Sequence, residues 1–145
     1  KLVWLLSLVL LLFPVIKTEA STFEEECNLM EEEFWDELEL LALITMAEAE
    51  GEPEEGKRLV IDVILNRCDS ELFPDTITEV IEQPHQFSPM SNGRINRVEL
   101  NEEVCLLVLE ELENRTNSEV IYFNSIGYQH GKAMFKVGHH YFSGR

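Results

Sequence analysis

The sequence has few basic residues: 11 Lys and Arg stand against 28 Asp and Glu, which gives the 145 residues a formal net charge of −17. Nucleic-acid binding depends on Lys and Arg side chains that neutralise phosphates, so this shortage argues against a nucleic-acid partner. It argues equally against electrostatic attraction to anionic membrane surfaces or anionic polymers. The acidic surplus favours solubility, and a polyanionic target would have to be recognised by the shape of a site.

Cysteine is also scarce, and no metal-binding or nucleophile motif is present. Cys27, Cys68 and Cys105 are odd in number and have no motif spacing, which excludes a disulfide framework and leaves room for one bridge. His139 and His140 are adjacent, so their side chains point in different directions on a strand or a helix. Neither His-Glu-x-x-His nor Gly-x-Ser-x-Gly occurs. We therefore expect no metal, no cofactor and no Ser or Cys nucleophile.

The long apolar run at the start of the sequence is shorter than a membrane span. It covers residues 2–16, whereas a spanning helix needs roughly 20 apolar residues. Lys1 precedes the run, and the small residues Thr18 and Ala20 occupy the two positions that a signal peptidase reads. This pattern predicts a signal peptide over residues 1–20 and an extracytoplasmic protein. The alternative is an uncleaved membrane anchor, which would then be the protein's membrane contact.

The rest of the chain is long enough for one domain with its own core. Residues 21–33 form an acidic leader, and residues 34–145 form the predicted domain. Apolar periodicity and capping signals predict helices, with Pro53 at a first helical position and Asp75 and Asn101 as N-caps. We expect an α+β, mainly helical domain with a small sheet or hairpin toward its C-terminus. The predicted helices cover residues 34–49, 53–67, 76–81 and 102–114. A strand is predicted at residues 120–123, and a last apolar stretch lies around residues 137–142.

Residues 82–100 have no sustained periodicity and contain two prolines and a glycine. A loop of this length inside a small domain is usually functional or disordered, and the apolar residues Phe87 and Ile95 argue against disorder. Gln86, Phe87 and Ser88 offer an amide, a ring and a hydroxyl, the groups that a sugar-binding site uses if the ring is exposed. The alternative is a turn-rich loop anchored by one phenylalanine.

Glu48 ends an apolar helix and stands between the small residues Ala47 and Ala49. A carboxyl group held against apolar walls has a raised pKa, and a glycosidase needs such a group to protonate a leaving oxygen. Glu50 and Glu52 follow directly. Taken alone, a glutamate after a helix is more often a surface residue than a catalytic one.

Several segments together resemble one known family. Residues 47–57, Ala-Glu-Ala-Glu-Gly-Glu-Pro-Glu-Glu-Gly-Lys, resemble the active-site segment of cell wall hydrolases of the SleB/CwlJ type, known from spore cortex lysis and phage lysis. Further segments follow in the family's order, and the resemblance covers roughly residues 40–142. These segments are residues 63–67 (Val-Ile-Leu-Asn-Arg), 73–77 (Phe-Pro-Asp-Thr-Ile), 86–89 (Gln-Phe-Ser-Pro), 93–96 (Gly-Arg-Ile-Asn) and 137–142 (Val-Gly-His-His-Tyr-Phe).

The resemblance implies a compact, mainly helical, lysozyme-like domain in which Glu48 is catalytic. Enzymes of this type act as lytic transglycosylases on peptidoglycan glycan strands, between N-acetylmuramic acid and N-acetylglucosamine. One carboxyl group first protonates the glycosidic oxygen and then serves as the base; simple hydrolysis is the related outcome. The implied location is the cell wall or spore cortex. The residues expected to bind substrate are Gln86, Phe87, Ser88, Tyr122 and His140.

Three positions depart from the family's pattern. Glu82 stands where an aromatic residue is usual, His85 where Gly or Asn is common, and His139 where Asn is usual. These changes keep a second hypothesis open: a wall-binding or regulatory protein of the same fold with weak or no turnover. The sequence does not predict the oligomeric state.

Overall fold

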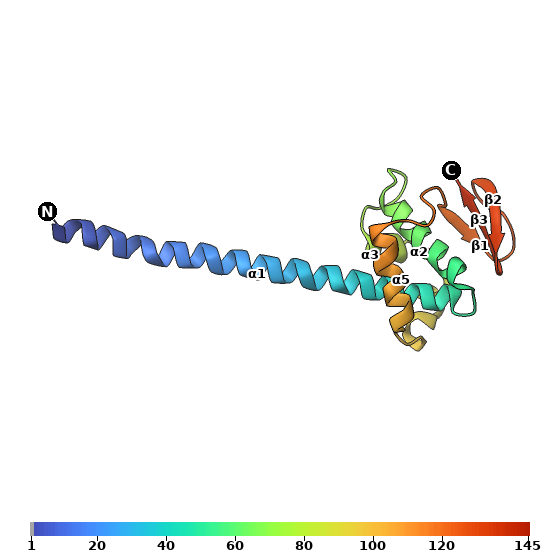
Figure 1. Cartoon of the computed structure of the whole chain (residues 1–145), viewed down its shortest axis with the longest axis horizontal. Helices are drawn as coiled ribbons and strands as arrows, with labels where there is room; N and C mark the ends of the chain where they lie inside the picture. Colours follow the sequence, from blue (N-terminus) through green and yellow to red (C-terminus); the bar gives the residue numbers. More distant parts are fainter. Residues whose placement is uncertain (1) are drawn as a thin grey trace. The chain divides into compact units, whose positions relative to one another are not determined.

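The computed structural model describes the backbone of residues 2–145 and the side chains of residues 25–145. The chain divides into two units, Lys1–Asp36 and Glu37–Arg145. The first helix, α1 (Leu2–Ala49), begins well before the predicted residue 34 (Figure 1). Residues 25–36 of this helix are exposed, so the acidic leader is helical and solvated wherever its side chains are described.

Within the described part of the chain, none of the helices combines the length and apolarity needed to cross a membrane. The predicted signal peptide, residues 1–20, lies outside the residues whose side chains are described and stays a prediction.

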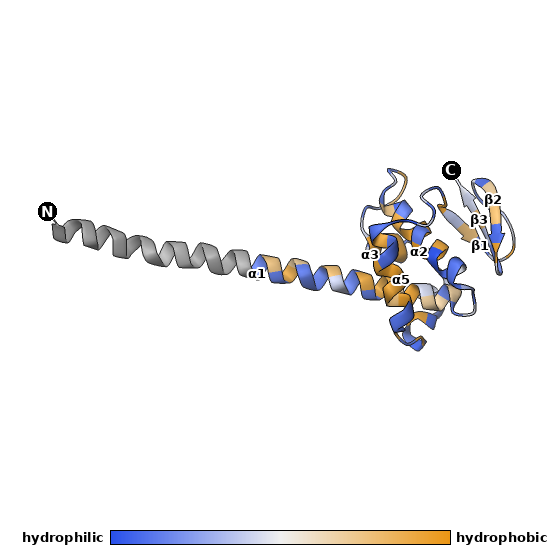
Figure 2. Cartoon of the chain, viewed as in Figure 1, coloured by the Kyte–Doolittle hydropathy of each residue, from blue (hydrophilic) through white to orange (hydrophobic). Residues whose placement is uncertain are grey.

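The second unit is built around α2 (Glu54–Cys68), which contacts α3, α5 and β1 (Figure 1). The predicted apolar face of α2 is confirmed, since Leu59, Val60, Val63 and Ile64 are at most 1% exposed. The helices alternate between hydrophobic and hydrophilic segments, as amphipathic elements do (Figure 2). The remaining helices are α3 (Ile77–Glu82), α4 (Ser88–Asn92), the 3₁₀-helix η1 (Arg94–Arg97) and α5 (Glu102–Glu113).

Of the three predicted positions at helix starts, one is confirmed and two differ by one residue. Asn101 caps α5, with its side-chain oxygen accepting from the backbone N–H groups of Glu103 and Val104. The cap of α3 is Thr76, one residue after the predicted Asp75, and its hydroxyl accepts from the Glu79 backbone. Pro53 is the N-cap of α2 rather than its first helical residue. Its ψ angle of 160° is extended, so the helix begins one residue later, at Glu54.

Three antiparallel strands complete the second unit, in the order β1-β3-β2 (Figure 1). They are β1 (Tyr122–Asn124), β2 (Lys132–Val137) and β3 (His140–Gly144). Phe123 of β1 lies opposite Phe142 of β3. The expected α+β, mainly helical architecture is therefore confirmed, including its small C-terminal sheet.

The core consists of two clusters that meet near the end of α1. Met46 belongs to the cluster formed with α2, α3 and α5, whereas Ala49 belongs to the cluster with α2, Val120 and Phe142. Glu48 lies between these two residues in the sequence. The fold thus carries this carboxylate into a partly buried position where the helix passes from one cluster to the other.

Candidate active site

Glu48 is half-buried near the C-terminal end of α1. Burial raises the pKa of its carboxyl group to about 7, although the positive charge of Arg94 acts in the opposite direction. A substantial fraction of Glu48 is therefore protonated near neutral pH. The carboxyl group can donate a proton, as an acid that protonates a leaving oxygen must.

Arg94, the first residue of η1, is the charged neighbour of this carboxyl group. Its guanidinium group forms an ion pair with Glu50, with 3.2 Å between Arg94 Nη2 and Glu50 Oε2. The sequence placed Arg94 in a polar loop and in a segment that resembles the family, but it did not predict the role of Arg94 as a charge partner. The fold brings the loop and the end of α1 together, and that contact has no local sequence signal.

Arg67 gathers three of the predicted substrate-binding residues around itself. It is only 4% exposed, and its Nη1 donates to Gln86 Oε1 at 3.1 Å. Its guanidinium carbon lies over the rings of Phe73, Phe87 and Tyr122 at 4.9, 5.4 and 5.7 Å from their centroids. Gln86, Phe87 and Tyr122 are thus close together, but they surround a buried arginine.

Phe87 does not provide the exposed ring expected of a sugar-stacking residue. It is 2% exposed and its ring centroid is 6.2 Å from that of Phe123. The alternative for this loop, a turn-rich segment anchored by one phenylalanine, describes Phe87 correctly. Ser88, which begins α4, and Gln86 are exposed, and Tyr122 is half-buried.

His140 begins β3 and is 6% exposed, whereas the neighbouring His139 is exposed. The two side chains therefore point in different directions, as predicted. The His140 ring lies 5.0 Å from the Phe123 ring, and its Nδ1 has no hydrogen-bond partner among the described residues. Burial lowers the pKa of His140, while the negative charge of Glu52 opposes this effect. The His140 Nδ1 is therefore enclosed by the protein without a hydrogen bond to any described residue.

Glu52 is fixed by the turn between β2 and β3. Its Oε2 accepts from the His139 backbone N–H at 2.9 Å, and its Oε1 lies 2.8 Å from His139 Nδ1. The Glu52 side chain is only 7% exposed. This pair joins the segment between α1 and α2 to the sheet.

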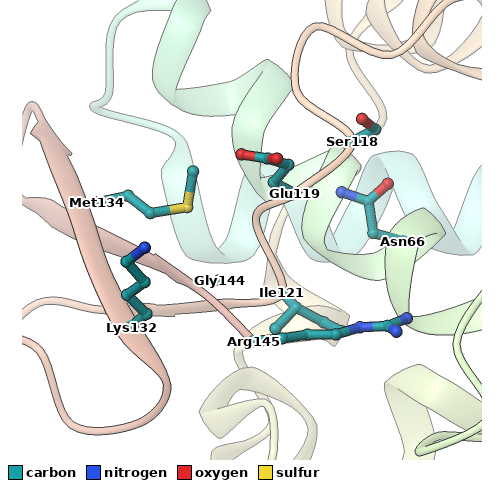
Figure 3. Close-up of a pocket in the computed structure, with 8 residues that line it drawn as sticks. All are labelled: Asn66, Ser118, Glu119, Ile121, Lys132, Met134, Gly144 and Arg145. Atoms are coloured by element: carbon teal, nitrogen blue, oxygen red, sulfur yellow. The ribbon is translucent and has the colours of Figure 1, made fainter.

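A pocket of about 450 Å³ lies elsewhere, between α2, the segment before β1, and strands β2 and β3 (Figure 3). None of the predicted site residues lines it. It is therefore separate from the groups around Glu48, but it borders the Arg67 cluster at Ile121, whose carbonyl accepts from Arg67 Nε. Its lining residues are Asn66, Ser118, Glu119, Ile121, Lys132, Met134, Gly144 and Arg145.

Curated relatives share part of this chain. Two spore cortex-lytic enzymes, from Oceanobacillus iheyensis and Bacillus subtilis, are each 38% identical to it over 90 residues, or 61% of this chain. The match spans 32% and 29% of those two proteins, about a third of their length.

Two solved structures resemble the fold. The catalytic domain of the Bacillus cereus SleB protein superposes with a TM-score of 0.67 and 28% identity, covering 75% of this chain and 90% of that domain. The catalytic domain of the germination-specific lytic transglycosylase SleB from Bacillus anthracis gives a TM-score of 0.64 and 28% identity, covering 74% and 93%.

The family model described as Cell Wall Hydrolase matches residues 51–143. The match begins after Glu48, so it covers the Glu52–His139 pair, the Arg67 cluster and Arg94 but not the candidate acid itself. It extends over more than half of the chain, and with it the family is established: the chain belongs to the cell wall hydrolases.

Proposed function

We propose that this chain cleaves the glycan strands of peptidoglycan as a lytic transglycosylase, between N-acetylmuramic acid and N-acetylglucosamine, with Glu48 as acid and then base. The observation that carries this proposal is the half-buried Glu48 carboxyl group, whose pKa burial raises to about 7. Membership of the cell wall hydrolases and similarity to a domain described as a lytic transglycosylase support the substrate and the reaction class.

In the first step, protonated Glu48 gives its proton to the glycosidic oxygen as the bond to the muramoyl anomeric carbon breaks. Glu48 is then a carboxylate, and the positive charge of Arg94 stabilises this form. In the second step, Glu48 accepts the proton of the muramoyl 6-hydroxyl as that oxygen bonds to the anomeric carbon. The product is a 1,6-anhydro ring, and Glu48 is protonated again. Attack by water in place of the 6-hydroxyl would give hydrolysis.

Four predicted side chains remain proposed substrate contacts: Gln86, Ser88, Tyr122 and His140. His140 is 6% exposed, and because its unpartnered Nδ1 is enclosed by the protein, the proposed sugar contact is with the remaining exposed edge of the ring. The Ser88 hydroxyl is exposed. Gln86 already accepts from Arg67 through Oε1, which leaves its amide N–H₂ group as a donor. Phe87 is not proposed as a sugar-stacking residue, because its ring is buried.

The proposed location is extracytoplasmic, in the cell wall or spore cortex. It rests on the signal-peptide pattern in residues 1–20, followed by the acidic leader at 21–33 and the catalytic domain at 34–145. Export would bring the domain to its proposed substrate, which lies outside the cytoplasmic membrane.

The test is digestion of purified sacculi, with the soluble products resolved by mass spectrometry. Anhydro-muramoyl ends are expected, whereas reducing ends would show hydrolysis in place of transglycosylation. Glu48→Gln should remove product formation, because the amide has no proton to donate and cannot accept one afterwards. Glu39→Gln is the matched control, since Glu39 is an exposed glutamate on the same helix.

Two outcomes would contradict the proposal in different ways. Equal rates for Glu48→Gln and the parent would remove Glu48 as the acid. Binding of the parent to sacculi without any product would favour the second hypothesis, a wall-binding or regulatory protein of this family.

A further inference from the structure

We propose that Glu52 is a positioning residue of the proposed active site: its carboxylate clamps the β2–β3 turn and thereby fixes His140 beside the substrate. This inference rests on the proposed function. It concerns a different glutamate from the proposed acid, and a different kind of role. The evidence is the geometry around the carboxylate, the shape of the turn and the position of His140.

Both carboxylate oxygens of Glu52 are occupied by one residue of the turn. Oε2 accepts from the His139 backbone N–H at 2.9 Å, and Oε1 lies 2.8 Å from His139 Nδ1. The carboxylate therefore fixes both the backbone and the side chain of His139. A bidentate contact of this kind restricts orientation more than a single hydrogen bond does.

The turn is shaped to receive this carboxylate. Gly138 has a φ of +55°, a left-handed conformation that favours glycine, and a Cβ atom at this position would overlap the Glu52 carboxylate. On the other side, a Cβ at Gly56 would lie 3.1 Å from Glu52 Cβ and 3.6 Å from Val137 Cγ1. The absence of side chains at both glycines lets the turn and the start of α2 approach each other around Glu52.

The clamp also keeps Glu52 ionised. Burial raises the pKa of Glu52, but the backbone and ring hydrogen bonds of His139 outweigh this effect, and the net pKa is lowered. Glu52 and Glu48 thus have pKa values displaced in opposite directions. A carboxylate that stays charged and has both oxygens engaged is suited to hold a turn and unsuited to donate a proton.

His140 connects the clamp to the site because it follows His139 directly and begins β3. Its ring is buried against Phe123, its Nδ1 is unpartnered, and it feels the negative charge of Glu52. Fixing the backbone of His139 therefore fixes the direction of the next side chain, which is the proposed substrate contact.

The clamp itself is tested by NMR titration of the histidine rings in the full chain. In Glu52→Gln the His140 midpoint should move to lower pH, because the negative charge that favours the imidazolium is gone. The backbone amide signal of His139 should shift as well. Glu55→Gln is the control, since Glu55 is exposed and lies in the first turn of α2. Unchanged His139 and His140 signals in Glu52→Gln would overturn the clamp.

The positioning role is tested by the kinetics of sacculus cleavage. Glu52→Ala should lower kcat/KM by about tenfold to a hundredfold, as misplacement of a contacting group does. His139→Ala should cause a smaller loss, because its backbone N–H still reaches Glu52. His139→Asn should keep a higher kcat/KM than His139→Ala, since an asparagine side chain offers an amide donor to the Glu52 carboxylate. The decline of activity above neutral pH should stay in place, because Glu48 sets it.

The other possible results of the cleavage experiments separate the positioning role from the proposed function. Full activity in folded Glu52→Ala and His139→Ala would overturn the positioning role and leave the proposed function intact. Loss of the descending pH limb in Glu52→Gln would make Glu52 the titrating acid and would overturn the positioning role too. If the parent produces no fragments, the proposed function fails and the positioning role with it. The titration would still establish whether the clamp exists.

Discussion

At the scale of single residues, two opposing effects set the pKa of the Glu48 carboxyl group. Burial at the end of α1 raises its pKa to about 7, and Arg94 lowers it. The exposed ion pair with Glu50 helps to orient Arg94, although a surface pair of this kind contributes little stability. The pH at which Glu48 loses its proton therefore depends on a residue that is not required to touch the substrate.

Replacement of Arg94 should extend activity to higher pH. In Arg94→Gln the charge that favours the Glu48 carboxylate is removed, so the pKa of Glu48 rises further above its ordinary value. The descending limb of kcat/KM against pH, near pH 7 in the parent, should move upward. The maximum rate should fall at the same time, because the carboxylate formed in the first step is less stable.

The measurement is a pH–rate profile on sacculi for the parent and the variant. Arg97→Gln provides the control, because Arg97 is an exposed arginine of the same 3₁₀-helix. A limb that stays in place in Arg94→Gln would mean that Arg94 does not act on the titrating group.

At the scale of elements, Arg67 joins the end of α2 to two segments that are distant in sequence. Its Nε donates to the Ile121 carbonyl at 2.9 Å and its Nη1 to Gln86. It also lies over three aromatic rings. Arg67→Met keeps most of the side-chain volume but leaves the Ile121 carbonyl without this donor. We expect a loss of roughly 2–3 kcal/mol in the free energy of unfolding.

Urea denaturation of the parent and Arg67→Met measures this loss. Arg97→Met should change the free energy of unfolding by no more than about 0.5 kcal/mol, because Arg97 is exposed. Equal stability of Arg67→Met and the parent would show that Arg67 does not hold these elements together.

The elements that the sequence predicted well are those with a local signal. The apolar period of α2 and the capping asparagine of α5 need only neighbouring residues to be recognised. The start of α1 was missed because residues 21–33 carry little apolar periodicity, although glutamate is a good helix former. Local patterns therefore located α2, α3 and α5, but they missed the beginning of α1 and the short helices α4 and η1, which lie in the segment predicted as a loop.

The candidate site was only partly predictable for the same reason. Glu48 had a signal in its small apolar neighbours and in the family resemblance. The burial of Phe87 had no sequence signal. In an aperiodic loop, the sequence does not indicate whether an arginine distant in the chain will pack against an aromatic ring. The Glu52–His139 contact joins residues 87 positions apart, and its partners are defined only once the sheet has formed beside α2.

For the whole molecule, a buried pair of carboxyl groups links stability to pH. Asp62 of α2 is fully buried, and Glu111 of α5 is 1% exposed. Burial, and after it the neighbouring carboxyl group of Glu111, raise the pKa of Asp62 from 3.8 to about 8. Asp62 therefore binds a proton more tightly in the folded state than in the unfolded state. Stability from this group is complete at low pH and is lost as pH rises through about 8.

Asp62→Asn should remove this dependence, because an amide stays neutral at every pH. Its carbonyl can still accept from the Asn117 backbone N–H, as Asp62 Oδ2 does at 2.7 Å. The variant should gain stability relative to the parent as pH is raised from about 5 to about 8. Urea denaturation at both pH values measures the change, and Glu113→Gln, an exposed substitution on α5, is the control. A constant difference between Asp62→Asn and the parent would contradict the raised pKa of Asp62 in the folded state.

The net charge of −17 bears on how the whole protein meets its proposed substrate. Sacculi that retain anionic polymers repel an acidic protein, and salt screens this repulsion because the Debye length falls from about 30 Å at 0.01 M to about 8 Å at 0.15 M. The initial cleavage rate should therefore rise over that range. Sacculi stripped of those polymers should give a much weaker dependence, since their glycan strands offer less charge to screen. A rate that falls with salt on both substrates would instead indicate that basic groups near the site, such as Arg94, attract the wall.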